Sequence, residues 1–267
     1  TPDMEERAGI PHHLMDVVDP EYDFSAMEYA KLASEAIADV ASRGKIPILC
    51  GGTGMYHDSL MKISSFSEGE ADEALRDELY KYAQDNGNEA LHEMLAEFDP
   101  EAAANIHPNN VKRVIRAIEI YKTTGKTKTE TDREQISGEI PYDNTAFILD
   151  FADRDLLYSR IEKRVEIMID MGLERDVRDI LCSGREISRT ASQAIGYKEF
   201  LPYFNGEKTL DEVAADIKLA TRHYAKRQMI WFRRYKDAVR LVPDENGAVK
   251  TAAQLADEAI LYIVLNK

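Results

Sequence analysis

One short segment of the chain has the composition of a ligand site. Gly51, Gly52, Thr53 and Gly54 follow an apolar run at residues 46–50. Glycines just after a strand let a backbone approach a ligand closely, and the Thr53 hydroxyl can donate or accept a hydrogen bond. A tight turn without a ligand has the same composition, so the pattern alone leaves both interpretations open.

Clusters of cationic residues are the second feature that could bind a ligand, and they are unusual because the chain as a whole is acidic. The 267 residues carry a net charge of −15, which by itself argues against an anionic partner. Residues 111–128 and 222–240 reverse this balance, since each is rich in Lys and Arg and holds one acid, Glu119 and Asp237 respectively. Such clusters are typical of contact with a phosphate backbone, and a solvated helix face is the alternative.

Both basic clusters fall on predicted helices. At residues 110–124 an apolar stripe is accompanied on another side by three cations, Lys112, Arg113 and Arg116. A long helix at about 209–234 begins with the capping box Thr209-x-x-Glu212. Three cations form one stripe along it: Arg222, Lys226 and Arg233.

The remaining pattern indicates an α/β chain. A helix predicted at 25–44 leads into the apolar run 46–50, which has the character of a buried strand, and a second strand is predicted in "TAFILDF" from Thr145. Helices are predicted between them at 72–85, 89–98 and 110–124, and beyond them at 156–171 and 174–181. We therefore predict an α/β core with C-terminal helices at 1–67 and 136–267, and a helical insertion domain at 68–135.

Several classes of protein and site are excluded or disfavoured. No apolar run approaches the ~18 residues that cross a bilayer. The two cysteines, Cys50 and Cys182, form neither a disulfide framework nor a metal signature, which favours a cytoplasmic setting. Gly125-Lys126-Thr127 imitates part of a phosphate-binding loop, but it ends a helix and lacks the earlier glycine. Gly125 is better explained as a helix C-cap.

Five separated motifs together resemble one family. In order they are "GIPHHLMDVVDP", "GKIPILCGGTGMY", "HPNNVKRVIRAIEIY", "SQAIGYKEF" and "TRHYAKRQMIWFRR". This series is similar to that of the tRNA dimethylallyltransferases, also called tRNA isopentenyltransferases, and it covers nearly the whole chain. None of the motifs would suffice alone.

The resemblance implies a fold, a reaction and partners. The fold would be a P-loop-kinase-like parallel sheet core, carrying a helical domain that grips the anticodon stem-loop of tRNA. The reaction would transfer a dimethylallyl group from dimethylallyl diphosphate to the N6 amine of the adenosine 3′-adjacent to the anticodon. The implied cofactor is Mg²⁺, and the expected state is a cytoplasmic monomer with no membrane contact.

The resemblance also implies roles for individual residues. Thr53 would be catalytic, facing the target adenosine, with Gly51, Gly52 and Gly54 lining the same substrate site. Contacts to tRNA or to the diphosphate would come from Arg76, Lys112, Arg113, Arg116, Gln193, Arg222, Lys226, Arg227 and Gln228.

The chain departs from the family pattern at its start. The family begins with a strand, a phosphate-binding loop of the G-x-x-x-x-G-K-[ST] type and an Asp that serves as the general base, and all of these would precede Thr1. We therefore expect the chain to lack this segment and to be inactive alone, with the metal ligands and the general base upstream.

Three alternatives remain open. The first is an adenylate dimethylallyltransferase, which would prenylate AMP. So small an acceptor would not need a helical insertion with cationic faces, which disfavours this alternative. A non-catalytic RNA-binding fragment is compatible with the missing loop. A nucleotide kinase of similar core is the weakest alternative, because neither its phosphate loop nor its lid arginines can be identified.

Overall fold

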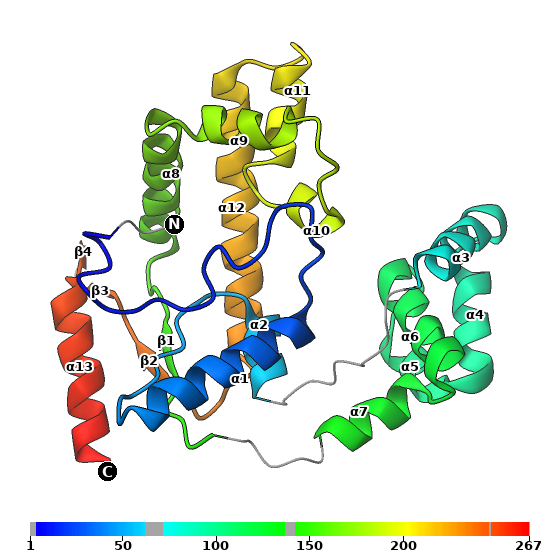
Figure 1. Ribbon diagram of the computed structural model, residues 1–267, viewed down its shortest axis with the longest axis horizontal. Helices are drawn as coiled ribbons and strands as arrows, with labels where there is room; N and C mark the ends of the chain where they lie inside the picture. Colours follow the sequence, from blue (N-terminus) through cyan, green and yellow to red (C-terminus); the bar gives the residue numbers. More distant parts are fainter. Residues whose placement is uncertain (1–3, 62–71, 137–141, 246, 267) are drawn as a thin grey trace. The chain divides into compact units, whose positions relative to one another are not determined.

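The computed structural model describes residues 4–61, 72–136, 142–245 and 247–266 (Figure 1). Its contacts divide the chain into two compact units. The first unit comprises Thr1–Ser25, Ile48–Gly54 and Asp143–Lys267, and the second comprises Ala26–Pro47 and Met55–Tyr142. These units follow contacts rather than domain boundaries, so the insertion domain at 68–135 stays a prediction.

The second unit is built from helices. They are α1 (Ala26–Ser42), α3 (Glu73–Asn86), α4 (Asn88–Phe98), α5 (Pro100–Asn105), α6 (Val111–Thr124) and α7 (Lys128–Ile136), while α2 (Gly54–Leu60) begins at the boundary between the units. The predicted helices at 25–44, 72–85, 89–98 and 110–124 are confirmed, whereas α5 and α7 were not predicted.

Apolar faces of α3 to α6 form the core of this unit. Leu91, Leu95, Val114 and Ile118 are fully buried in it. The helix ends are specified locally, since the Asp72 carboxylate accepts a hydrogen bond from Leu75 N–H at 2.9 Å. Gly125 ends α6 in the left-handed conformation with φ 72°, which confirms the predicted C-cap.

The first unit combines helices with short strands. Its main helices are α8 (Arg154–Asp170), α9 (Leu173–Leu181), α12 (Leu210–Phe232) and α13 (Ala252–Leu265), and shorter turns are α10 (Arg189–Ser192), η1 (Lys198–Phe200) and α11 (Leu201–Phe204). The predicted helices at 156–171, 174–181 and 209–234 are confirmed, including the Thr209 capping box. The core between α8, α9 and α12 buries Val165, Val177, Phe200, Val213 and Ile217.

A small parallel sheet lies in the same unit. Strand β1 (Phe147–Leu149), which confirms the prediction in "TAFILDF", pairs with β2 (Val239–Leu241). A hairpin of β3 (Asp244–Glu245) and β4 (Ala248–Val249) follows. The Asp244 carboxylate accepts hydrogen bonds from the N–H groups of Ala152 (2.8 Å) and Asp153 (2.7 Å), which ties the start of α8 to β3.

The predicted buried strand at 46–50 is wrong. Residues 45–50 are irregular, and Ile46 and Ile48 are 82% and 87% exposed. Among the described residues no strand pairs with this segment, and an apolar run becomes a strand only where a neighbour completes its ladder. The fold class is therefore mixed, mostly helical with a small parallel sheet.

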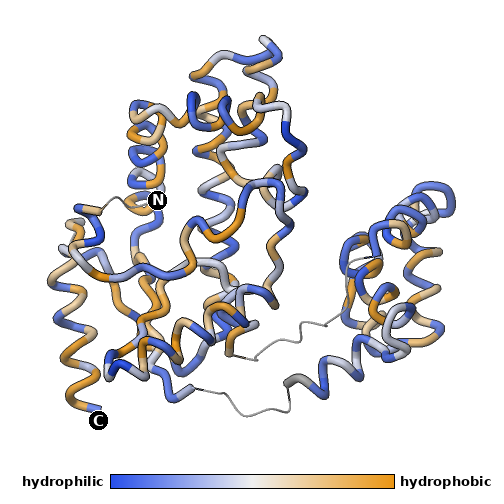
Figure 2. Tube along the Cα trace, viewed as in Figure 1, coloured by the Kyte–Doolittle hydropathy of each residue, from blue (hydrophilic) through white to orange (hydrophobic). Residues whose placement is uncertain are grey.

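Apolar residues also mark the C-terminal half of α13 (Figure 2). Ile260, Leu261, Val264 and Leu265 are more than half exposed there. No helix in the described ranges combines the length and the apolar character needed to cross a membrane.

Candidate active site

The glycine corner, defined as Gly51–Gly54, packs against one face of α12. The Gln228 side-chain amide donates a hydrogen bond to the Gly52 carbonyl oxygen at 2.8 Å. The hydroxyls of Thr53 and Tyr224 lie 3.4 Å apart. Tyr224 and Gln228 are one helical turn apart, so two successive corner residues are met by one side of the helix.

Trp231 completes this face of α12, three residues beyond Gln228. A Cβ atom on Gly54 would lie 2.2 Å from Trp231 Cδ1, so only glycine fits beneath the indole ring. Arg234 lies over the same ring, with its Cζ 4.4 Å from a ring centroid, an arrangement typical of a cation–π contact. Within the described residues the buried Trp231 Nε1 has no hydrogen-bond partner.

Two of the three glycines let the backbone of the corner lie close to α12. A Cβ on Gly52 would lie 2.1 Å from Gln228 Nε2, whereas one on Gly51 would meet nothing within 4 Å. Thr53 is exposed between the partly buried Gly52 and the buried Gly54. Thr53 is thus exposed, while α12 contacts the backbone of the corner on its buried side.

Cations on α12 have different environments. Arg222 forms an ion pair with Glu162 on α8 at 2.6 Å, so part of the predicted cationic stripe is internally neutralised. Arg227 is exposed, with its Cζ 5.7 Å from the Tyr224 ring centroid. Lys226 is exposed and has no ion-pair partner among the described residues. These two cations are available to an anionic ligand.

Gln193 lies apart from the contacts at the corner. It caps α10 and is exposed, and among the described residues its side chain makes no hydrogen bond to the glycine corner. The neighbouring backbone is anchored to the N-terminal segment, because Ser188 N–H donates to Pro20 O at 2.9 Å and Thr190 N–H donates to Asp23 at 3.0 Å. Its predicted substrate contact stays a prediction.

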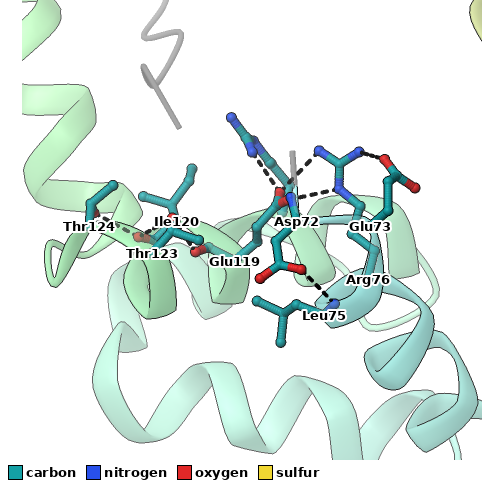
Figure 3. A network of polar contacts seen from close by, with 9 residues as sticks. Asp72, Glu73, Leu75, Arg76, Glu119, Ile120, Thr123 and Thr124 are labelled. Carbon is teal, nitrogen blue, oxygen red and sulfur yellow. Dashed lines mark hydrogen bonds and ion pairs between the residues drawn. The ribbon is translucent and has the colours of Figure 1, made fainter. Parts of the chain in front are cut away.

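In the second unit, two of the predicted tRNA-contacting arginines converge on one buried carboxylate. Glu119 on α6 has no exposed side-chain surface, and Arg76 Nε lies 2.9 Å from one of its oxygens. Arg116 Nη1 contacts the other oxygen at 2.6 Å, and Asp72 N–H donates to the first at 3.0 Å. Figure 3 shows Arg76 reaching from α3 to Glu119 and also to Glu73.

This geometry shifts the pKa values of the network. Burial alone would raise the pKa of Glu119, but hydrogen bonds from Arg116, Arg76 and the Asp72 amide outweigh it, so the pKa lies below its ordinary value. The pKa of Arg76 is raised by its carboxylate partners, despite the opposing effect of burial. The network is therefore fully charged at neutral pH.

Lys112 and Arg113 differ from this pair. Both are exposed on the first turn of α6, and within the described ranges neither has an ion-pair partner. Among the described residues, the charges of Lys112 and Arg113 are consequently not balanced by an ion pair.

Sequence inspection missed three side chains of these sites: Tyr224, Trp231 and Glu119. Tyr224 and Trp231 share the face of Gln228 at helical spacing, which could have singled them out once the corner was known to pack there. Glu119 is the single acid in the basic run 111–128, and its place in the apolar stripe of α6 was the available signal.

The described residues do not include a group of three or more His, Cys, Asp or Glu side chains that could hold a metal ion. The predicted Mg²⁺ therefore stays a prediction, and no ligand for it is assigned.

Comparison with known proteins identifies the family. The sequence profile of the IPP transferase family matches residues 1–235. A tRNA dimethylallyltransferase of Acetivibrio thermocellus is 44% identical over 244 residues, covering 91% of this chain and 78% of that protein. One from Caldanaerobacter subterraneus is 44% identical over 232 residues, covering 86% of this chain and 74% of that protein.

Solved structures agree with this assignment. The tRNA isopentenylpyrophosphate transferase of Staphylococcus epidermidis has a TM-score of 0.65 at 36% identity, covering 100% of this chain and 84% of that chain. A eukaryotic dimethylallyltransferase acting on tRNA has a TM-score of 0.79 at 27% identity, covering 100% of this chain and 69% of that chain. The chain therefore belongs to the IPP transferase family, whose matched relatives are named tRNA dimethylallyltransferases.

Proposed function

We propose that this protein transfers a dimethylallyl group from dimethylallyl diphosphate to the N6 amine of the adenosine 3′-adjacent to the anticodon of tRNA. The observation that carries the proposal is the glycine corner, which α12 holds from behind with Thr53 exposed, in a chain of this family. The Thr53 hydroxyl can donate to or accept from the edge of an adenine, and a base in a single-stranded loop is unpaired and can be flipped into a pocket.

Two sets of cations support the ligand assignment. Negative charge develops on the diphosphate as it leaves, and nearby cations can stabilise it. Lys226 and Arg227 are exposed cations on α12, the helix that also contacts the glycine corner. Lys112 and Arg113 are suited to the phosphate backbone of the anticodon stem-loop. The finer assignments belong to this proposal: a P-loop-kinase-like core, bound Mg²⁺ to neutralise the leaving diphosphate, and a cytoplasmic monomer.

Transfer is tested with the full-length gene product, dimethylallyl diphosphate and two competing acceptors. The expected product is an N6-dimethylallyl adenosine in a synthetic anticodon stem-loop, detected by mass spectrometry, with AMP left unmodified. A control loop with guanosine at the target position lacks the N6 amine and should remain unmodified. Efficient modification of AMP would contradict the tRNA assignment. Binding of the stem-loop without transfer to either acceptor would instead support a non-catalytic RNA-binding protein.

A further inference from the structure

The contacts behind the glycine corner have a regular arrangement. Gly52 is held by Gln228, Thr53 lies beside Tyr224, and Gly54 lies beneath Trp231. The three α12 residues occupy positions i, i+4 and i+7, which fall on one side of a helix. One rigid element therefore contacts three consecutive corner residues.

The contact at Gly52 is directional. The hydrogen bond from Gln228 Nε2 to the Gly52 carbonyl is 2.8 Å long and partly buried, and it leaves no room for a side chain at position 52. The hydrogen bond commits one N–H of the Gln228 amide to the backbone of the corner. This differs from the substrate-binding role predicted for Gln228 from the sequence.

The contact at Gly54 depends on shape. The indole ring occupies the space of the missing Cβ, and among the described residues its buried N–H finds no acceptor. A ring held without a hydrogen bond is located by packing, here between Gly54 and the Arg234 guanidinium. Packing of this kind resists small displacements of the corner backbone.

We propose that the face of α12 formed by Tyr224, Gln228 and Trp231 is a positioning surface. It fixes the backbone of Gly52–Gly54 so that the exposed Thr53 hydroxyl meets the reacting substrate in one orientation. Gln228 acts through the Gly52 carbonyl and does not touch the substrate itself. The inference rests on the proposed function, because that function gives Thr53 its role at the reacting centre.

The first test is a double-mutant cycle in the full-length protein with Gln228→Met and Gly52→Ala. Met retains the length of the side chain but cannot donate, and Ala at position 52 displaces Gln228 Nε2. Because misplacement by about 1 Å can cost up to 100-fold in rate, we expect each variant to lower kcat about tenfold or more. The KM values for stem-loop and dimethylallyl diphosphate should stay within about twofold.

The double variant should be no slower than the slower single variant, since both remove the same contact. Gln84→Met is the matched control, because Gln84 is an exposed residue of α3, and it should leave kcat and both KM values unchanged. A raised KM with unchanged kcat in Gln228→Met would show direct substrate binding and overturn the positioning role. Multiplicative losses in the double variant would also overturn it.

The second test does not depend on activity. Trp231 is the only tryptophan among these 267 residues, so the tryptophan fluorescence of this chain reports on the corner alone. We expect Gly52→Ala and Gln228→Met each to increase quenching of Trp231 by acrylamide at least 1.5-fold, with no change in Gln84→Met. Unchanged quenching in both corner variants would contradict a shared positioning surface. If the wild-type protein transfers no dimethylallyl group, the proposed function fails, and the quenching result still decides whether α12 fixes the corner.

Discussion

At the scale of single residues, the three glycines of the corner have different requirements although the sequence presents them as one motif. Gly52 and Gly54 are each in contact with an α12 side chain that would collide with a Cβ, while Gly51 faces open space. The sequence could locate the corner and nominate Gln228. It could not pair Gln228 with Gly52, because that contact joins segments 176 positions apart.

Gly54→Ala should destabilise the protein. The new methyl group would lie 2.2 Å from Trp231 Cδ1, and the ring can move only by disturbing its packing. Overpacking of this kind costs about 1–3 kcal/mol in the free energy of unfolding. Urea denaturation followed by circular dichroism measures the cost, with a red shift of Trp231 emission expected in the folded state. Gly51→Ala is the matched control for stability and should stay within about 0.5 kcal/mol of wild type. Equal stability of the two variants would contradict the close fit of the indole ring over Gly54.

At the scale of elements, helices were easier to predict than strands. The main helices carry their own periodicity, and some also carry side-chain caps, as at Asp72 and Thr209. The run 46–50 carries only apolar character, which does not specify a strand without a partner. The ion pairs of Arg76 and Arg116 with Glu119 were equally hard to predict. The sequence shows that both arginines are charged, but it does not show that they pair with this carboxylate.

The Glu119 network should make the joint between α3 and α6 sensitive to acid. The folded-state pKa of Glu119 lies below its ordinary value of 4.5, so its contribution to stability is fully present above about pH 4.5 and is lost as the pH falls through the folded pKa. Glu119→Gln should therefore be less stable than wild type by about 2 kcal/mol at pH 7, because two guanidinium groups lose their anionic partner.

Urea denaturation at pH 7 and at pH 3 measures this difference, which should shrink at the lower pH. Glu101→Gln is the control, since Glu101 is 56% exposed in its pair with Arg133 and should change the stability little at either pH. A difference between wild type and Glu119→Gln that stays constant with pH would mean that the charge of Glu119 is not what stabilises the joint.

At the scale of the whole molecule, the protein has a net charge of −15 and an RNA substrate that is also negatively charged. Overall repulsion makes the local distribution of cations decisive, because screening confines each interaction to about 10 Å at 0.1 M salt. Within the described ranges, Arg76, Arg116 and Arg222 are matched by internal acids, whereas Lys112, Arg113 and Lys226 have no such partner. Cations of one helix thus differ in whether an acid of the same protein already balances their charge.

The salt dependence of stem-loop binding should reveal this division. Arg113→Ala should make the slope of log K against log salt shallower by about one, as expected for the loss of one phosphate contact. Arg133→Ala, which removes an exposed arginine already paired with Glu101, is the matched control and should leave the slope unchanged. Fluorescence anisotropy of a labelled stem-loop at several salt concentrations measures the slope. An unchanged slope in Arg113→Ala would show that this residue belongs to a solvated face.

The pairing of β1 with β2 also has a consequence for synthesis of the protein. Phe147 of β1 is matched with Val239 of β2, and α8 to α12 lie between them in the chain. Helices form within about a microsecond of becoming available, whereas a strand cannot pair before its partner exists. On the ribosome, β1 emerges well before β2 and has to wait for it while α8 to α12 are made. During that interval its apolar residues are open to chaperones and to the unpaired strands of other nascent chains.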